Sequence, residues 1–190
     1  MADYKVRRLR PDAHQVGIYN SAATVYLYDE THGAAITRAS PSLLQGFHGD
    51  AAHDVDAALI ALGEQGMLVV FELYQDDELQ AEVSLGPPLA GGEAGGSGIP
   101  WSEAQSTFLS LPSGALCIES MDCLRLGPEA PTDQGARLSL PPGDYVVSIQ
   151  CLGREYEQDA DDLVPEYFIS LVPAQKGARL PNRPFLAHPR

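Results

Sequence analysis

Apolar and polar residues alternate along much of this chain, and a period of two predicts β-strands. In the run 144–152, Tyr145, Val147, Ile149 and Cys151 occupy every second position. Alternate side chains of a strand share a face, so these four residues would line a buried face. The same pattern predicts strands at 4–9, 15–19, 23–28, 67–74, 79–85, 106–111, 115–119, 122–126, 136–140, 144–152 and 166–172.

One segment has helical periodicity instead. Within 51–62 apolar residues recur at i, i+4 and i+7, which places them on one face of a helix. Asp50 can cap the helix start, and Gly63 or Gly66 can end the helix. We therefore expect one short helix at 51–62.

The strand pattern predicts an all-β fold, mostly an antiparallel β-sandwich or a partly open barrel. A Gly/Pro-rich linker at 86–100 cannot form a helix or a central strand. It divides the chain into a β unit with one helix at 1–85 and a second β unit at 101–175. The two units would pack together in one globular body. A basic, proline-containing tail follows at 176–190.

The two units resemble each other in three places. The similar segments are 21–25 and 113–117, 62–73 and 140–151, and 83–87 and 169–173. Two explanations remain open at this point. An internal duplication would give two similar β units around a pseudo-twofold axis, whereas amphipathic strands can also match by chance.

Charge is sorted along the chain. Residues 11–175 hold 25 of the 26 acidic residues and only four basic ones, and the formal net charge is −14. Both chain ends are basic. An anionic body repels nucleic acid and anionic membranes and attracts cationic partners, so we expect binding to neither nucleic acid nor membrane. Opposite charge also favours chain ends that lie on the body, or on a neighbouring copy.

Three cysteines, Cys117, Cys123 and Cys151, are too few and odd in number for a disulfide framework. No stretch has the ~20 apolar residues that span a bilayer, and no apolar segment of a signal peptide follows the basic start. These features are typical of a cytoplasmic protein. Acidic compositions of this kind are common in bacteria, where they often serve solubility alone.

Two dense acidic runs fall between predicted strands. Asp76, Asp77 and Glu78 would form the tip of a hairpin that joins 67–74 to 79–85. The second run, before the last strand, consists of Glu155, Glu157, Asp159, Asp161 and Asp162. Each run is either a solvated loop or a negative surface that steers a basic partner such as a nuclease or a toxin.

His48, His53 and Asp56 are candidate metal ligands, because imidazole and carboxylate together suit zinc and related ions. On a helix that starts at residue 51, His53 and Asp56 share a face. The spacing matches neither HExxH nor a calcium loop, so the alternative is an acid-rich, solvated helix start.

The sequence contains no nucleophile elbow and no Walker loop. Cys117 and Cys151 fall on inward strand positions, where a thiol is expected to be buried and inert. We therefore expect no cofactor and no catalytic activity.

Three functions remain open. The first is a non-catalytic interaction module, similar to an inhibitor or an immunity protein, that binds a basic protein. The second is a metal-binding β domain or metal-dependent enzyme that uses His48, His53 and Asp56. The third is a homo-oligomer formed through the tail, where Arg183 and Phe185 would clasp a second subunit or dock on their own body. Charge sorting and the missing catalytic motifs favour the first.

Overall fold

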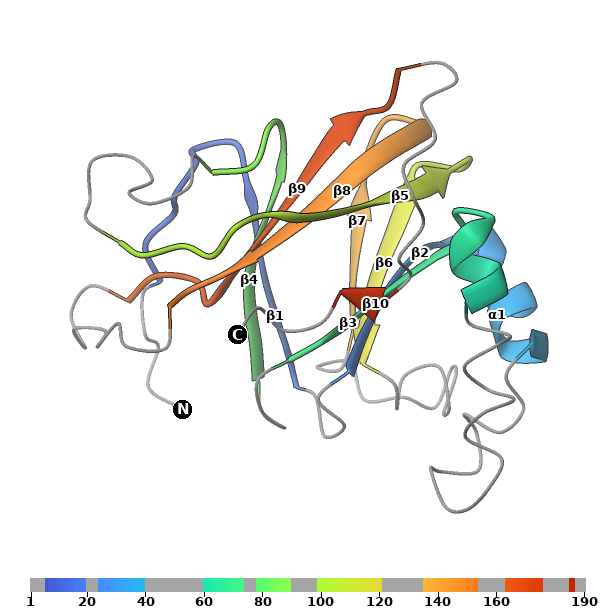
Figure 1. The fold of residues 1–190 in the computed structure, drawn as a ribbon, viewed down its shortest axis with the longest axis horizontal. Helices are drawn as coiled ribbons and strands as arrows, with labels where there is room; N and C mark the ends of the chain where they lie inside the picture. Colours follow the sequence, from blue (N-terminus) through green and yellow to red (C-terminus); the bar gives the residue numbers. More distant parts are fainter. Residues whose placement is uncertain are drawn as a thin grey trace.

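The computed structural model describes residues 6–19, 24–39, 60–73, 78–89, 99–120, 135–153, 163–175 and 185–186. These residues form two open β-sheets that face each other (Figure 1). In spatial order, sheet A contains β1 (His14–Tyr19), β4 (Glu78–Leu85), β9 (Tyr167–Pro173), β8 (Gly143–Cys151) and β5 (Gln105–Leu111). Sheet B contains β10 (Phe185–Leu186), β3 (Leu68–Glu72), β2 (Thr24–Asp29), β6 (Ala115–Ser120) and β7 (Gly135–Ser139).

The predicted β class is confirmed, and neighbouring strands are mostly antiparallel. Parallel pairing occurs between β4 and β9 and between β10 and β3. The strand predictions match β1 to β9 to within two residues at each end. The strand predicted at 122–126 lies outside the described residues.

A largely aliphatic core lies between the sheets. The alternating residues of β8 that predicted a buried face do contribute to it, together with residues such as Leu27 of β2 and Val69 of β3. Leu27 and Val69 are fully buried. Burying one side chain of this size stabilises the fold by about 2 kcal/mol.

A second apolar cluster lies on the outer face of sheet B, beneath helical segments. These are η1 (Glu30–His32), α1 (Gly33–Ala39) and a helical turn at 60–64. Ile36 of α1 and Leu62 of the helical turn pack with Tyr26 and Val70 of the sheet. Figure 1 shows α1 and the helical turn side by side at one edge of the molecule. The sequence pattern predicts one helix, at 51–62, and α1 is an additional helix that the pattern does not predict.

The turn at 60–64 is the described end of the helix predicted at 51–62, and residues 51–59 lie outside the described part of the chain. Gly66 ends it, with φ +70°. Its N–H donates to the Gly63 carbonyl at 2.7 Å, and the Met67 N–H donates to the Leu62 carbonyl at 3.0 Å. This pair of bonds is the Schellman motif, in which a left-handed glycine satisfies the last carbonyls of a helix.

Two local predictions were wrong. Residues 67–74 and 79–85 do not form a hairpin, because β3 belongs to sheet B and β4 to sheet A. The chain therefore crosses between the sheets where a tight turn was expected. Residues 6–9 are not a strand either. The backbone N–H of Leu9 donates to the Glu82 side chain, and that of Arg7 donates to the Leu163 carbonyl in the segment before β9.

No internal duplication is shown. The similar segments 62–73 and 140–151 contain β3 and β8, which lie in different sheets. Val83 and Ile169, from the third similar pair of segments, stand directly opposite each other in the parallel strands β4 and β9. Neighbouring in-register strands share one core and one outer face, so their similar sequences reflect a shared environment.

Candidate functional site

The N-terminal residues 6–13, here called the strap, bind across the outer face of sheet A. The Arg7 N–H donates to the Leu163 carbonyl at 2.7 Å. The Val6 carbonyl accepts a hydrogen bond from Gln15 Nε2 at 2.9 Å. The strap thus lies beside β1 at its start and beside the segment that leads into β9. This agrees with the expectation that the basic start lies on the acidic body.

Glu82, in the middle of β4, holds the centre of the strap. Its carboxylate accepts the Leu9 N–H at 2.7 Å and the Arg10 N–H at 2.8 Å, and the residue is 0% exposed. Burial raises the pKa of Glu82, and this outweighs the lowering by the two amide hydrogen bonds and by the charges of Arg10 and Arg8. A buried carboxylate is therefore matched to two successive backbone amides.

The Arg10 guanidinium continues the same contact. Nη1 donates to Ser84 Oγ at 3.3 Å and Nη2 to the Pro87 carbonyl at 2.6 Å. Its Cζ lies 4.9 Å from the centroid of the Phe168 ring. A cation over an aromatic face gains from the ring quadrupole in addition to its hydrogen bonds. Arg10 is thus held from three sides.

A row of serines crosses the sheet beside this contact. Ser84, Ser170, Ser148 and Ser106 are register partners on β4, β9, β8 and β5. The hydroxyls of Ser106 and Ser148 are 2.7 Å apart. Ser170 is 0% exposed, and its Oγ has no hydrogen-bond partner among the described residues. Three of these four serines, Ser84, Ser148 and Ser170, are buried, so this row places polar groups inside the covered outer face of sheet A.

Gln150 of β8 is the register partner of Phe168, which in turn pairs with Glu82, and it anchors the chain beside the serine row. Its Oε1 accepts the Leu89 N–H at 2.8 Å, and its Nε2 donates to the Leu89 carbonyl at 3.2 Å and the Ser102 carbonyl at 3.1 Å. Both described ends of the predicted linker 86–100 are thus fixed to sheet A, because Ile99 is also fully buried. Residues 90–98 lie outside the described residues.

The acidic residues predicted to bind a partner lie mostly outside the described residues. These are Asp76, Asp77, Glu155, Glu157, Asp159, Asp161 and Asp162. Glu78 is described, and it begins β4 opposite Tyr19. β9 begins at Tyr167, which pairs with Ala81 near the start of β4. In the sequence each acidic run precedes one of these strands, and β4 and β9 begin at the same end of sheet A, which we call the acidic end.

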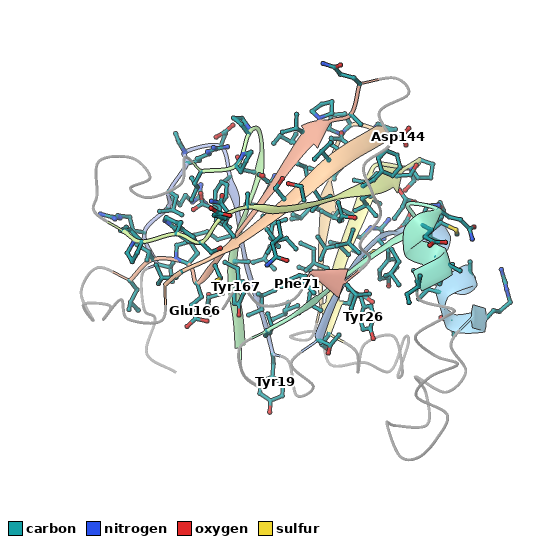
Figure 2. All side chains as sticks on the ribbon, in the orientation of Figure 1. Tyr19, Tyr26, Phe71, Asp144, Glu166 and Tyr167 are labelled. Carbon is teal, nitrogen blue, oxygen red and sulfur yellow. The ribbon has the colours of Figure 1, made fainter. Side chains whose placement is uncertain are left out.

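Two exposed side chains, those of Glu166 and Tyr19, lie at the acidic end. Glu166 directly precedes β9, and Tyr19 at the end of β1 is 50% exposed. Figure 2 shows the Tyr19 ring directed away from the sheets. Tyrosine is among the residues enriched in the energetic hot spots of protein interfaces.

The other predicted site residues are not assembled by the described structure. His48, His53 and Asp56 lie outside it, and the described residues contain no group of three or more side chains that could hold a metal ion. Phe185 begins β10, whose backbone pairs with β3 at Val70. Arg183 lies outside the described residues, so a clasp between subunits stays a prediction.

Cys117 and Cys151 are buried thiols, as expected from their strand positions. Burial raises the pKa of Cys117 to about 11, and the neighbouring Glu119 adds to this rise. A thiol with this pKa is protonated at neutral pH and is a poor nucleophile. Among the described helices none combines the length and apolar character needed to cross a membrane.

Fold and site together define a protein of two open β-sheets with a strapped polar face and an acidic end. No family model and no curated protein sequence matches the chain. A solved structure described as "Crocagin biosynthetic gene J" is similar, with a TM-score of 0.53 and 16% identity over 86% of this chain and 98% of that chain. This likeness shows a shared fold.

A second similar structure is ComJ from Bacillus subtilis, described as an inhibitor of the DNA-degrading activity of NucA. Its TM-score is 0.45 at 12% identity, over 85% of this chain and 96% of that chain. This likeness is too loose to carry an argument about function.

Proposed function

We propose that this chain is a non-catalytic binding module that holds a basic protein at the acidic end of sheet A, in the manner of an inhibitor or immunity protein. The attachment of both acidic runs to one end of the sheet carries the proposal. Like charges gathered at one place raise the local potential, which accelerates encounter with a cationic partner.

The contacts of two described arginines support the same proposal. Arg10 is engaged by the polar face of sheet A, and Arg137 of β7 forms an ion pair with Glu30 of η1. These arginines therefore do little to offset the negative charge at the acidic end. The formal net charge of −14 leaves a large excess for a partner to neutralise.

The exposed ring of Tyr19 would supply the apolar part of the contact. Charge alone gives fast association but modest affinity, since exposed ion pairs contribute only about 0–1 kcal/mol each. An aromatic residue that becomes buried at the centre of an interface contributes about 2 kcal/mol or more. We propose that a partner covers Tyr19 and meets the acidic runs around it.

Capture from a lysate of the native host tests the proposal. The immobilised chain is expected to retain a basic protein at about 0.1 M salt and release it at about 1 M, where the Debye length falls from about 10 Å to about 3 Å. An unrelated protein of equal net charge is the control. A host lysate from which nothing is retained at low salt, or only what the control also retains, contradicts the proposal.

A further inference from the structure

The contact between the strap and sheet A has the composition of a peptide-recognition site. Glu82 accepts two successive backbone N–H groups, at 2.7 and 2.8 Å, and this requires an extended segment rather than a particular side chain. Ser84, the Pro87 carbonyl and the Phe168 ring then hold one guanidinium. Lysine cannot reproduce this set, because a planar fork is needed to reach two acceptors while stacking on a ring.

The hydrogen bonds that hold the strap are ones that water can replace, and Leu9 adds one apolar contact. Among its described residues only Ala13 is buried; Val6, Leu9 and Arg10 are partly exposed, and Arg7 and Arg8 are exposed. The face beneath it contains Glu82 and Ser84, which water would solvate if the strap left, and an apolar cluster that includes Phe168, against which Leu9 packs. Separation therefore exposes the apolar contact of one partly buried leucine and the Phe168 ring, which is less than the loss of a core strand exposes.

Two features show that the bound strap leaves a polar group without a hydrogen-bond partner and some space unfilled. Ser170 Oγ is buried without a partner among the described residues. A shallow cavity of about 270 Å³ lies beside the strap, lined by residues that include Val6, Gln15, Gln80 and Pro165. A buried unpartnered hydroxyl is costly, so a better-fitting segment has something to gain here.

We propose that this site binds an arginine-bearing extended segment of the basic partner, and that the strap occupies it as an internal stand-in until the partner displaces it. The inference rests on the proposed function, because the partner supplies the displacing segment. Arg7 bonds to Leu163, which directly follows the second acidic run. A partner held at the acidic end therefore already lies beside the strap.

Competition by the strap sets the apparent affinity. A partner binds only to the fraction of molecules whose site is open, so weakening the strap tightens binding in proportion. Arg10→Ala removes the guanidinium from the strap but leaves Glu82, Ser84 and Phe168 in place for an incoming arginine. Arg38→Ala, an exposed arginine on α1, is the matched control.

A labelled peptide of residues 6–13 tests the site without the partner. We expect the full-length Arg10→Ala chain to bind this peptide at least about tenfold more tightly than the wild type or the Arg38→Ala chain does. Adding Glu82→Gln to Arg10→Ala should abolish the gain. A peptide carrying Arg10→Lys has the same charge and should bind at least about tenfold more weakly, which separates recognition from general attraction to an acidic protein.

Hydrogen exchange of the wild-type chain provides a readout that needs no variant. A saturating excess of the labelled peptide should increase the exchange rates of the Leu9 and Arg10 amides at least about tenfold, because the displaced strap loses its bonds to Glu82. Equal peptide affinity for all chains, or unchanged exchange at both amides, overturns the inference. If a captured partner still binds in that case, the proposed function stands and only its use of this site fails.

Discussion

At the scale of single residues, two buried carboxylates that bind loop residues have pKa values shifted in opposite directions. Asp29, at the end of β2, is 0% exposed and accepts hydrogen bonds from Thr31 and Ser113. Burial would raise the pKa of Asp29, but these four bonds outweigh it and lower the pKa. Glu82 receives only two amides, and there burial prevails and raises the pKa.

Asp29→Asn should therefore destabilise the chain by about 1–3 kcal/mol at neutral pH, because an amide cannot accept all of these bonds. A lowered folded-state pKa gives stability that is present above the unfolded value of about 3.9 and lost as the pH falls through the folded value. Urea unfolding at neutral and acidic pH measures both effects. The exposed Asp144→Asn is the control, and equal destabilisation by the two variants would refute this role of Asp29.

The contribution of Glu82 to the free energy of unfolding should change with pH in the opposite direction to that of Asp29. Its raised pKa gives stability that is fully present below the unfolded value of about 4.3 and declines as the pH rises through the folded value. The free energy of unfolding of the wild type, relative to Glu82→Gln, should therefore decrease from acidic towards neutral pH. A difference between the two chains that stays constant over this pH range would show that burial does not govern this carboxylate.

At the scale of elements, local alternation predicted the strands but not their partners. The prediction of β8 is confirmed, because its alternate residues face one core. This alternation can be seen within the nine residues of the strand, without knowledge of its neighbours. The hairpin between β3 and β4 failed because the choice of sheet depends on contacts with β2 and β9, far along the chain. α1 was missed because seven residues hold too few turns to show a helical period.

The strap was missed for a related reason. Residues 4–9 alternate like a strand, but the backbone of Leu9 bonds to Glu82, 73 residues away. One signal was present in the sequence: Glu82 stands between Ala81 and Val83 in an apolar strand. A carboxylate at such a position must be paired or bonded when it is buried. The remaining predicted site residues fall largely outside the described ranges, and their roles stay predictions.

The two-residue strand β10 covers the edge of β3, and this gives a prediction about the tail. Removing residues 177–190 should expose the β3 edge and increase self-association, because an open edge pairs readily with another chain. Light scattering at several concentrations measures the mass of the full and trimmed chains. If the trimmed chain forms particles with fewer subunits than the full chain does, the result would instead support a tail that clasps a second subunit.

At the scale of the whole molecule, the acidic end and the strap act in sequence in our account. Charge brings a basic partner to the end of sheet A, and an arginine of that partner then competes with Arg10 for the polar face. Tyr19→Ala should weaken partner binding by about 2 kcal/mol, roughly thirtyfold, through dissociation rather than association. Surface-plasmon kinetics separate the two rates, and an unchanged dissociation rate would remove Tyr19 from the interface.

The most direct test of the account compares two double variants with the same change in net charge. Asp161→Asn and Asp162→Asn alter the second acidic run, whereas Glu64→Gln and Asp144→Asn remove two exposed charges elsewhere. The affinity of each for the captured basic partner is measured at about 0.1 M salt. Binding at the acidic end requires a loss of at least about tenfold in the first variant and little change in the second. Equal affinities in the two variants would mean that net charge, and not this end of sheet A, attracts the partner.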